Sequence, residues 1–216
     1  MCENGEEKRG FTDKSAAAFG AALLLLAPSA YAAEPLQGKT IYIDAGHGGE
    51  DSGAGGNGLL EKNINLAVSN KVIDKLETEG AKPVASRTDD TFLRLDERVA
   101  KASASQSDLF VSLHTNSAVS TASGTETYFN STYEGADSER LASDIQQQLV
   151  TSLGMKDRGV KEAPFYVITY SKMPSVLAEL GFITNPQDAD KLKSDNGQEH
   201  AADAVVNGIE TYYSGR

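Results

Sequence analysis

Short apolar runs alternate with stretches of helical periodicity through residues 39 to 212. Lys39–Asp44 (KTIYID) is rich in β-branched and aromatic residues, and Asp108–Leu113 (DLFVSL) is an almost unbroken apolar run. Both patterns are typical of strands covered on both faces. From Glu61, apolar residues follow helical spacing until Gly80. This alternation predicts an α/β domain with a mixed, mostly parallel sheet of about six strands and helices on both faces.

The remaining segments are interpreted in the same way. Further strands are predicted at Lys82–Ser86, Thr125–Phe129, Phe165–Thr169 and Ser175–Leu180. Further helices are predicted at Leu93–Ala104, at Asp137–Leu153, from Asn185-Pro186 onward, and at Gly197–Tyr212. We find no internal repeat and no sign of a second domain.

The N-terminal segment has the pattern of an export signal. Ala16–Ala27 is an apolar run that follows Lys14, and small residues follow it in SAYAAEP. We therefore expect residues 1–33 to be a signal peptide, cleaved near Ala32 or Ala33, and residues 34–216 to form the folded domain. Because acidic residues outnumber basic ones before the run, an uncleaved anchor or a wrongly assigned start is the alternative.

Charge and cysteine content limit the possible ligands. The formal net charge of −11 argues against binding nucleic acid through a general positive field. Cys2 is the single cysteine, so an internal disulfide and a thiolate metal cluster are both excluded. Any metal site must therefore use histidine and carboxylate ligands.

A glycine-rich loop within Ile41–Asn63 follows the first predicted strand. Its glycines match neither a Walker motif nor the GxGxxG dinucleotide fingerprint, which weakens a phosphate-binding interpretation. His47 lies in this loop, Glu61 closes it, and His114 follows the DLFVSL run. Glu179 ends the last predicted strand. Since ligands of open α/β sheets bind at the carboxyl ends of strands, we expect these side chains to converge on one edge.

Two histidines and one carboxylate are a known ligand set of catalytic zinc, with a fourth position left open for water. Zinc lowers the pKa of such a water toward neutrality. A second carboxylate beside it can accept the proton and pass it to a leaving amine. Glu179 fits this role because its apolar neighbours would raise its pKa.

Each residue also has a simpler interpretation. A histidine after a strand is often an ordinary loop residue, and Glu61 would also complement the dipole of the helix that it begins. Glu179 would be neutralised by an arginine such as Arg158. His200, in the last amphipathic helix, is interpreted as a surface residue.

Three motifs, in order, carry a family resemblance: DAGHGGEDSGAGGNGLLEKNINL, SLHTN and SVLAELGFITN, with RTDD and DRGVK between them. Over Lys39–Tyr213 the chain is similar to the zinc-dependent N-acetylmuramoyl-L-alanine amidases of the type 3 class. The resemblance implies a single-zinc peptidoglycan hydrolase, secreted or wall-associated in a bacterium. Such an enzyme cuts the amide between the lactyl group of N-acetylmuramic acid and the L-alanine of the stem peptide.

The resemblance also implies residue roles. It places the Zn²⁺ ligands at His47, Glu61 and His114 and the catalytic glutamate at Glu179. It suggests substrate contacts from Arg158 and Asn116. Ala45 stands where the family commonly has proline, and it is not a ligand. The segment from Tyr128 to Asp137 is too short for the inhibitory helix of some members, so no activator protein is expected.

Two alternatives stay open at this point. His47 and Glu50 form an HxxE pair, as in zinc carboxypeptidases, and would make Glu50 the ligand instead of Glu61. The domain would alternatively be a wall-binding module without catalysis, although such a module has no need of Glu179.

Overall fold

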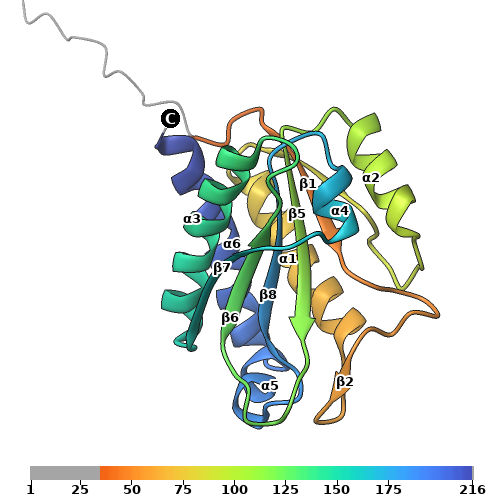
Figure 1. The fold of residues 1–216 in the computed structure, drawn as a ribbon, viewed down its shortest axis with the longest axis vertical. Coiled ribbons are helices and arrows are strands. Elements are labelled where there is room, and N and C mark those ends of the chain that lie inside the picture. The colour runs from red at the N-terminus through yellow and green to blue at the C-terminus, as the bar shows by residue number, and fades with distance from the viewer. Residues whose placement is uncertain (1–34, 216) are drawn as a thin grey trace, which may run out of the picture. The chain divides into compact units, whose positions relative to one another are not determined.

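The structure, a computed structural model, describes residues 35–215. Its centre is a six-stranded sheet in the order β4-β1-β5-β8-β6-β7 (Figure 1). The strands are β1 (Thr40–Ala45), β4 (Lys82–Ala85), β5 (Leu109–Asn116), β6 (Thr125–Phe129), β7 (Asp157–Glu162) and β8 (Ser175–Phe182). β4, β1, β5 and β8 are parallel, whereas β6 runs antiparallel to β8 and parallel to β7. The predicted mixed, mostly parallel sheet is confirmed.

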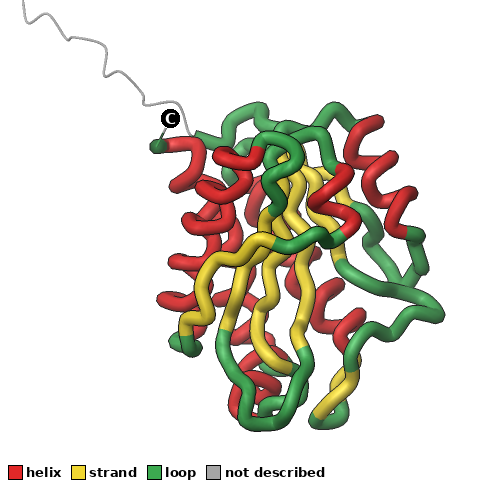
Figure 2. The backbone as a smooth tube through the Cα atoms, viewed as in Figure 1, coloured by secondary structure: helices red, strands yellow, loops and turns green. Residues whose placement is uncertain are grey.

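Helices lie on both faces of the sheet, in the layers that Figure 2 shows. The larger hydrophobic core joins one sheet face to α1 (Glu61–Thr78), α3 (Gly135–Leu153), α5 (Pro186–Leu192) and α6 (Asp195–Ser214). The smaller core joins the other face to α2 (Leu95–Ala104) and α4 (Tyr166–Tyr170). Among residues 35–215, no helix combines the length and apolarity that a membrane span requires.

The second face of the sheet carries the smaller core. α2 and α4 pack on Tyr42, Phe110 and Leu177, and the two aromatic rings are stacked 5.3 Å apart. Because side chains alternate along a strand, Glu179 points to the same face as Leu177. Figure 1 shows α2 and α4 beside the upper part of the sheet, whereas the arrowhead of β5 points to the lower part.

In the six-stranded sheet, one predicted strand is wrong and one strand is missed. Phe165–Thr169 was expected to be a strand, but α4 occupies this segment as a short helix. A short run rich in aromatic and β-branched residues does not distinguish a strand from a helical turn. The sixth strand is instead β7 at the sheet edge, whose charged and glycine-containing sequence DRGVKE lacks a strand pattern. The predicted signal peptide lies outside the described residues.

A small hairpin lies inside the glycine-rich loop. β2 (Gly55–Gly56) and β3 (Leu59–Leu60) pair in an antiparallel manner. Asn57 and Gly58 connect them with φ angles of 50° and 76°. Two left-handed residues with the sequence Asn-Gly are the signature of a type I′ turn. The hairpin ends directly at Glu61, so the turn determines where α1 begins.

Candidate metal centre

The fold brings together His47, Glu61 and His114, which are distant in sequence. His47 follows β1, Glu61 opens α1 and His114 lies on β5. One ligand atom from each lies within 4.8 Å of the others. His47 Nε2 is 3.2 Å and His114 Nδ1 is 2.9 Å from Glu61 Oε1. Glu50, the alternative ligand, is exposed and stands outside this group.

The Glu61 carboxylate is fixed on both of its oxygens. Oε2 accepts a hydrogen bond from the backbone N–H of Ala54 at 2.8 Å, and Oε1 accepts one from Thr115 at 3.0 Å. Burial raises the pKa of Glu61, but hydrogen bonds to His114 and His47 outweigh it and hold the pKa far below its usual range. Glu61 is therefore a preoriented anion and not only a complement to the helix dipole.

The His47 ring is oriented by a second carboxylate. Its Nδ1 lies 2.8 Å from Asp51 Oδ2, so with Nε2 directed at the ligand group, Nδ1–H donates to Asp51. Burial lowers the pKa of His47, but hydrogen bonds to Glu61 and Asp51 outweigh it and raise the pKa to about 9. The two carboxylates therefore favour a positive charge at the position of the His47 ring. A carboxylate behind a histidine ligand is the usual device for orienting the ring.

Two buried arginines hold the backbone that carries His47. Arg98 forms an ion pair with Asp44 at 2.6 Å and donates to the carbonyls of Ala45 and His47 at 2.7 and 2.8 Å. Arg87 donates to the carbonyls of Ala45 and Gly46. His47 has φ 61°, a left-handed conformation that a non-glycine residue keeps only when its surroundings impose it.

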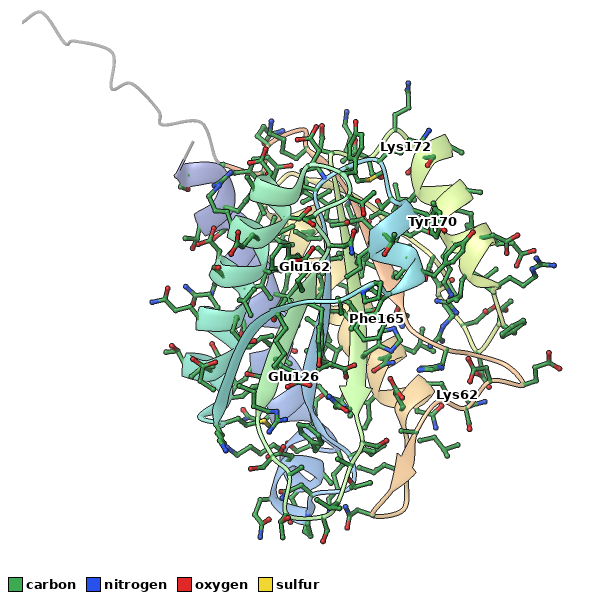
Figure 3. All side chains as sticks on the ribbon, viewed as in Figure 1. Lys62, Glu126, Glu162, Phe165, Tyr170 and Lys172 are labelled. Carbon is green, nitrogen blue, oxygen red and sulfur yellow. The ribbon has the colours of Figure 1, made fainter. Side chains whose placement is uncertain are left out.

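The next turn of the loop is held by the RTDD motif. The backbone N–H of Gly49 donates to Asp90 at 2.9 Å, and Lys62 donates to both the Gly49 carbonyl and Asp90. Figure 3 labels Lys62, which reaches across from the first turn of α1. The motif therefore fixes the loop and contributes no ligand.

Glycines allow the ligands to approach the loop backbone. A Cβ at Gly53 would lie 2.6 Å from both Glu61 Oε2 and His47 Cδ2, and one at Gly46 would clash with the His114 ring. Gly53 also has φ 62°. The glycine-rich loop thus packs against the ligand side chains themselves.

Glu179 lies next to the ligand group. It is paired with His114 in the parallel register of β5 and β8. Its Oε2 is buried and has no hydrogen-bond partner among the described residues. Burial raises the pKa of Glu179 to about 7, where the charge of His114 lowers it and the charges of Glu61 and Glu126 raise it. A carboxyl group with a pKa near neutrality can both accept and release a proton.

Glu126 is a site residue that the sequence did not reveal. It lies on β6 with its side chain only 3% exposed. Its oxygens accept hydrogen bonds from four side chains: Asn116 at 2.7 Å, Tyr128 at 2.7 Å, Arg158 at 2.7 Å, and Lys161. The interpretation that pairs Arg158 with Glu179 is therefore wrong. The alternation of TETYF indicates a strand, but only its pairing with β8 places Glu126 beside the site.

The other predicted site residues have clear positions. Asn116 donates to Glu126 and accepts from the N–H of Ser117, so its amide is engaged in holding the cluster. Arg158 donates through Nε, and its two Nη groups make no hydrogen bond to any other residue between 35 and 215. His200 is exposed on α6, as expected.

The donor set fits zinc. Two imidazole nitrogens and one carboxylate oxygen match the three protein ligands of catalytic zinc sites. A cavity of about 380 Å³ borders His47 and His114, which leaves room for a water and a substrate. Together with the adjacent Glu179, these residues form a candidate metal-dependent hydrolase site on an α/β sheet.

Comparison with known proteins identifies the family. The profile of the N-acetylmuramoyl-L-alanine amidases (Amidase_3) matches residues 41–211. The chain belongs to this family and is a hydrolase of the N-acetylmuramoyl-L-alanine amidase class.

Three similar proteins illustrate the relationship. The uncharacterized protein YqiI of Bacillus subtilis is 74% identical over 88% of this chain and 92% of its own length. The N-acetylmuramoyl-L-alanine amidase LytC of the same organism is 54% identical over 83% of this chain, but the match spans only 36% of LytC. The crystal structure of an N-acetylmuramoyl-L-alanine amidase from Clostridium difficile 630 has a TM-score of 0.80 and 34% identity, covering 83% of this chain and 99% of that one.

Proposed function

We propose that this chain is a zinc-dependent amidase that releases stem peptides from peptidoglycan outside the cytoplasm. In this proposal His47, Glu61 and His114 hold one Zn²⁺, and Glu179 is the general base. The main support is the convergence of three ligand atoms within 4.8 Å of one another, next to the unpartnered Oε2 of Glu179. Export by the segment 1–33 is part of the same proposal.

When bound, zinc would supply Lewis acidity to a water and to the amide carbonyl. Glu179 would take the proton of the attacking water and then transfer it to the leaving nitrogen of L-alanine. Its raised pKa suits both directions of transfer, because neither its protonated nor its ionised form dominates strongly near pH 7. Asp51 would keep the His47 ring in place throughout.

Arg158 and Lys161 are proposed to bind the stem peptide. Both cations contact Glu126, so the cluster carries one net positive charge on the β7 side of the site. A stem peptide bears free carboxylates, and a guanidinium with available Nη groups recognises a carboxylate through two parallel hydrogen bonds. Asn116, predicted as a substrate contact, is proposed to act through Glu126, which it helps to hold.

No activator is needed in this proposal. β6 ends at Phe129 and α3 begins at Gly135, so residues 130–134 form a short connection. This connection has no inserted helix that would reach the ligand group.

The test is digestion of purified peptidoglycan, with and without a chelator, followed by mass spectrometry. We expect free stem peptides with a new L-alanine amino terminus, lost with chelator and restored by added Zn²⁺. New reducing sugar ends, or peptides shortened only at their carboxyl ends, would contradict the proposal. Binding to the wall without any product would support the non-catalytic module instead.

A further inference from the structure

A cavity opens directly beside the ligand group. Its volume is about 380 Å³, and His47 and His114 form part of its wall. Phe92 in the loop before α2 and Leu95 at the start of α2 line it, together with Phe165 and Tyr166 at the start of α4. The cavity is therefore continuous with the metal centre, on the side away from β6 and β7.

Exposed apolar side chains gather at this cavity. The described residues contain eight exposed large hydrophobic side chains, and five of them lie at the start of α2 and just before it, or on α4 and the residue before it: Phe92, Leu95, Phe165, Tyr166 and Tyr170. Tyr166 and Tyr170 contact each other at 4.5 Å, and Figure 3 labels Phe165 and Tyr170 at the two ends of α4. A gathering of this kind beside a polar site is typical of a ligand pocket.

The charges around the cavity are balanced. Its two arginines are already paired, Arg98 with Asp44 and Arg94 with Asp96. Asp51, a further carboxylate of the wall, is paired with His47. An anionic stem peptide therefore meets no unpaired arginine here and is favoured at the Arg158 side, whereas a neutral ligand needs no such partner.

We propose that this cavity binds the sugar ring of the glycan strand, with the stem peptide extending in the opposite direction over β6 and β7. The inference rests on the proposed function, since only a lactyl ether separates that ring from the scissile amide at the metal. The apolar face of a pyranose packs on aromatic rings such as Phe92 and Tyr166, and the Arg94–Asp96 pair offers hydrogen bonds to its hydroxyl and acetamide groups.

The cavity also continues outward. A second hollow, of about 390 Å³, shares Phe92, Leu95 and Tyr166 with the first and includes Asp96. This arrangement provides room for the next sugar along the strand.

The experiment compares two substrates that carry the same stem peptide. One is the N-acetylmuramyl peptide, and the other is the corresponding N-lactoyl peptide without the sugar. We expect the parent enzyme to prefer the sugar-bearing substrate. In the Phe92→Ala/Tyr166→Ala variant, the ratio of the two kcat/KM values should fall by about tenfold or more, since two ring contacts are lost.

Matched variants complete the design. Tyr133→Ala removes an equally exposed ring, 41% exposed compared with 39% for Tyr166, from the connection between β6 and α3, and should leave the ratio unchanged. Tyr166→Phe keeps the ring and should retain most of the preference. An unchanged ratio in the double variant, or equal turnover of both substrates by the parent, overturns the sugar site while leaving the amidase function intact. Cleavage of neither substrate by the parent overturns both.

Discussion

Glu126 on β6 lies directly opposite Glu179 on β8 in the antiparallel register, and the two carboxylates have opposite surroundings. Glu126 accepts hydrogen bonds from four side chains, whereas Glu179 has a buried oxygen without a partner. Burial raises the pKa of both groups, but hydrogen bonds led by that from Lys161 outweigh it at Glu126 and lower its pKa. Of these two neighbouring carboxyl groups, Glu126 is therefore a fixed negative charge, whereas Glu179 is suited to accepting and releasing a proton.

Replacing Glu179 by glutamine should abolish hydrolysis and preserve the metal site. The amide keeps the shape of the side chain but cannot accept the proton of the attacking water. We expect kcat to fall by several powers of ten, because the base and the metal act as a unit. Zinc content, measured by atomic absorption, should stay near one ion per chain. Substantial lytic activity in this variant would show that another group is the base.

The same substitution should change how stability depends on pH. The folded carboxyl has a pKa of about 7, above its ordinary 4.5, so between these values the folded state binds more protons than the unfolded state. The stability of the parent therefore falls as pH rises through this window. We would measure the free energy of unfolding in urea, with a chelator present. The value for Glu179→Gln minus that for the parent should increase by about 2 kcal/mol between pH 5 and pH 8. A pH-independent difference would argue against the raised pKa.

Replacing Glu126 by glutamine should weaken substrate binding more than chemistry. Without the charge, Arg158 and Lys161 lose the partner that positions them, so we expect KM to rise with a smaller change in kcat. The lost charge-assisted hydrogen bonds should cost about 1–3 kcal/mol of stability. Glu162→Gln, on the exposed part of neighbouring β7, is the matched control, and Figure 3 labels both residues. Equal KM values for the two variants would show that the Glu126 cluster takes no part in substrate binding.

The convergence of His47, Glu61 and His114 could be predicted from the sequence because it follows from local patterns. His47 and Glu179 lie near the ends of buried strands, and strand ends converge in an α/β sheet. The hairpin around Asn57-Gly58 was not predicted, although its Asn-Gly pair is a local turn signal. Side chains placed by local structure plus a topological rule can be predicted from the sequence.

Features that depend on pairing between distant strands could not be predicted. Glu126 is near the site only because β6 reverses direction against β8, and no local pattern states that partner. The edge strand β7 carries Arg158 in a sequence too polar and glycine-containing to indicate a strand. The buried Arg98 is also placed by contacts with a loop about 50 residues earlier, although its helix was predicted.

Zinc content will distinguish the two candidate carboxylate ligands. Glu61 is buried within the ligand group, whereas Glu50 is exposed. We expect Glu61→Gln to lose zinc and activity, because the carboxylate that contacts both histidines becomes neutral. Glu50→Gln should keep both. Zinc loss in Glu50→Gln alone would favour the carboxypeptidase-like arrangement.

Two glycines of the same loop provide a test of the close approach to the ligands. Gly53 and Gly58 both have positive φ, 62° and 76°, so alanine is strained by a similar amount at each. A Cβ at Gly53 would lie 2.6 Å from Glu61 Oε2 and His47 Cδ2, whereas a Cβ at Gly58 meets nothing within 4 Å. Gly58→Ala should therefore cost about 1 kcal/mol of stability and keep zinc affinity. Gly53→Ala should add a large loss of zinc affinity, measured by competition with a chelating dye, because two ligands must move. Equal zinc affinities in the two variants would mean that the loop backbone can move away from the Glu61 and His47 side chains. The glycines would then be needed for the backbone conformation of the loop and not for the metal centre.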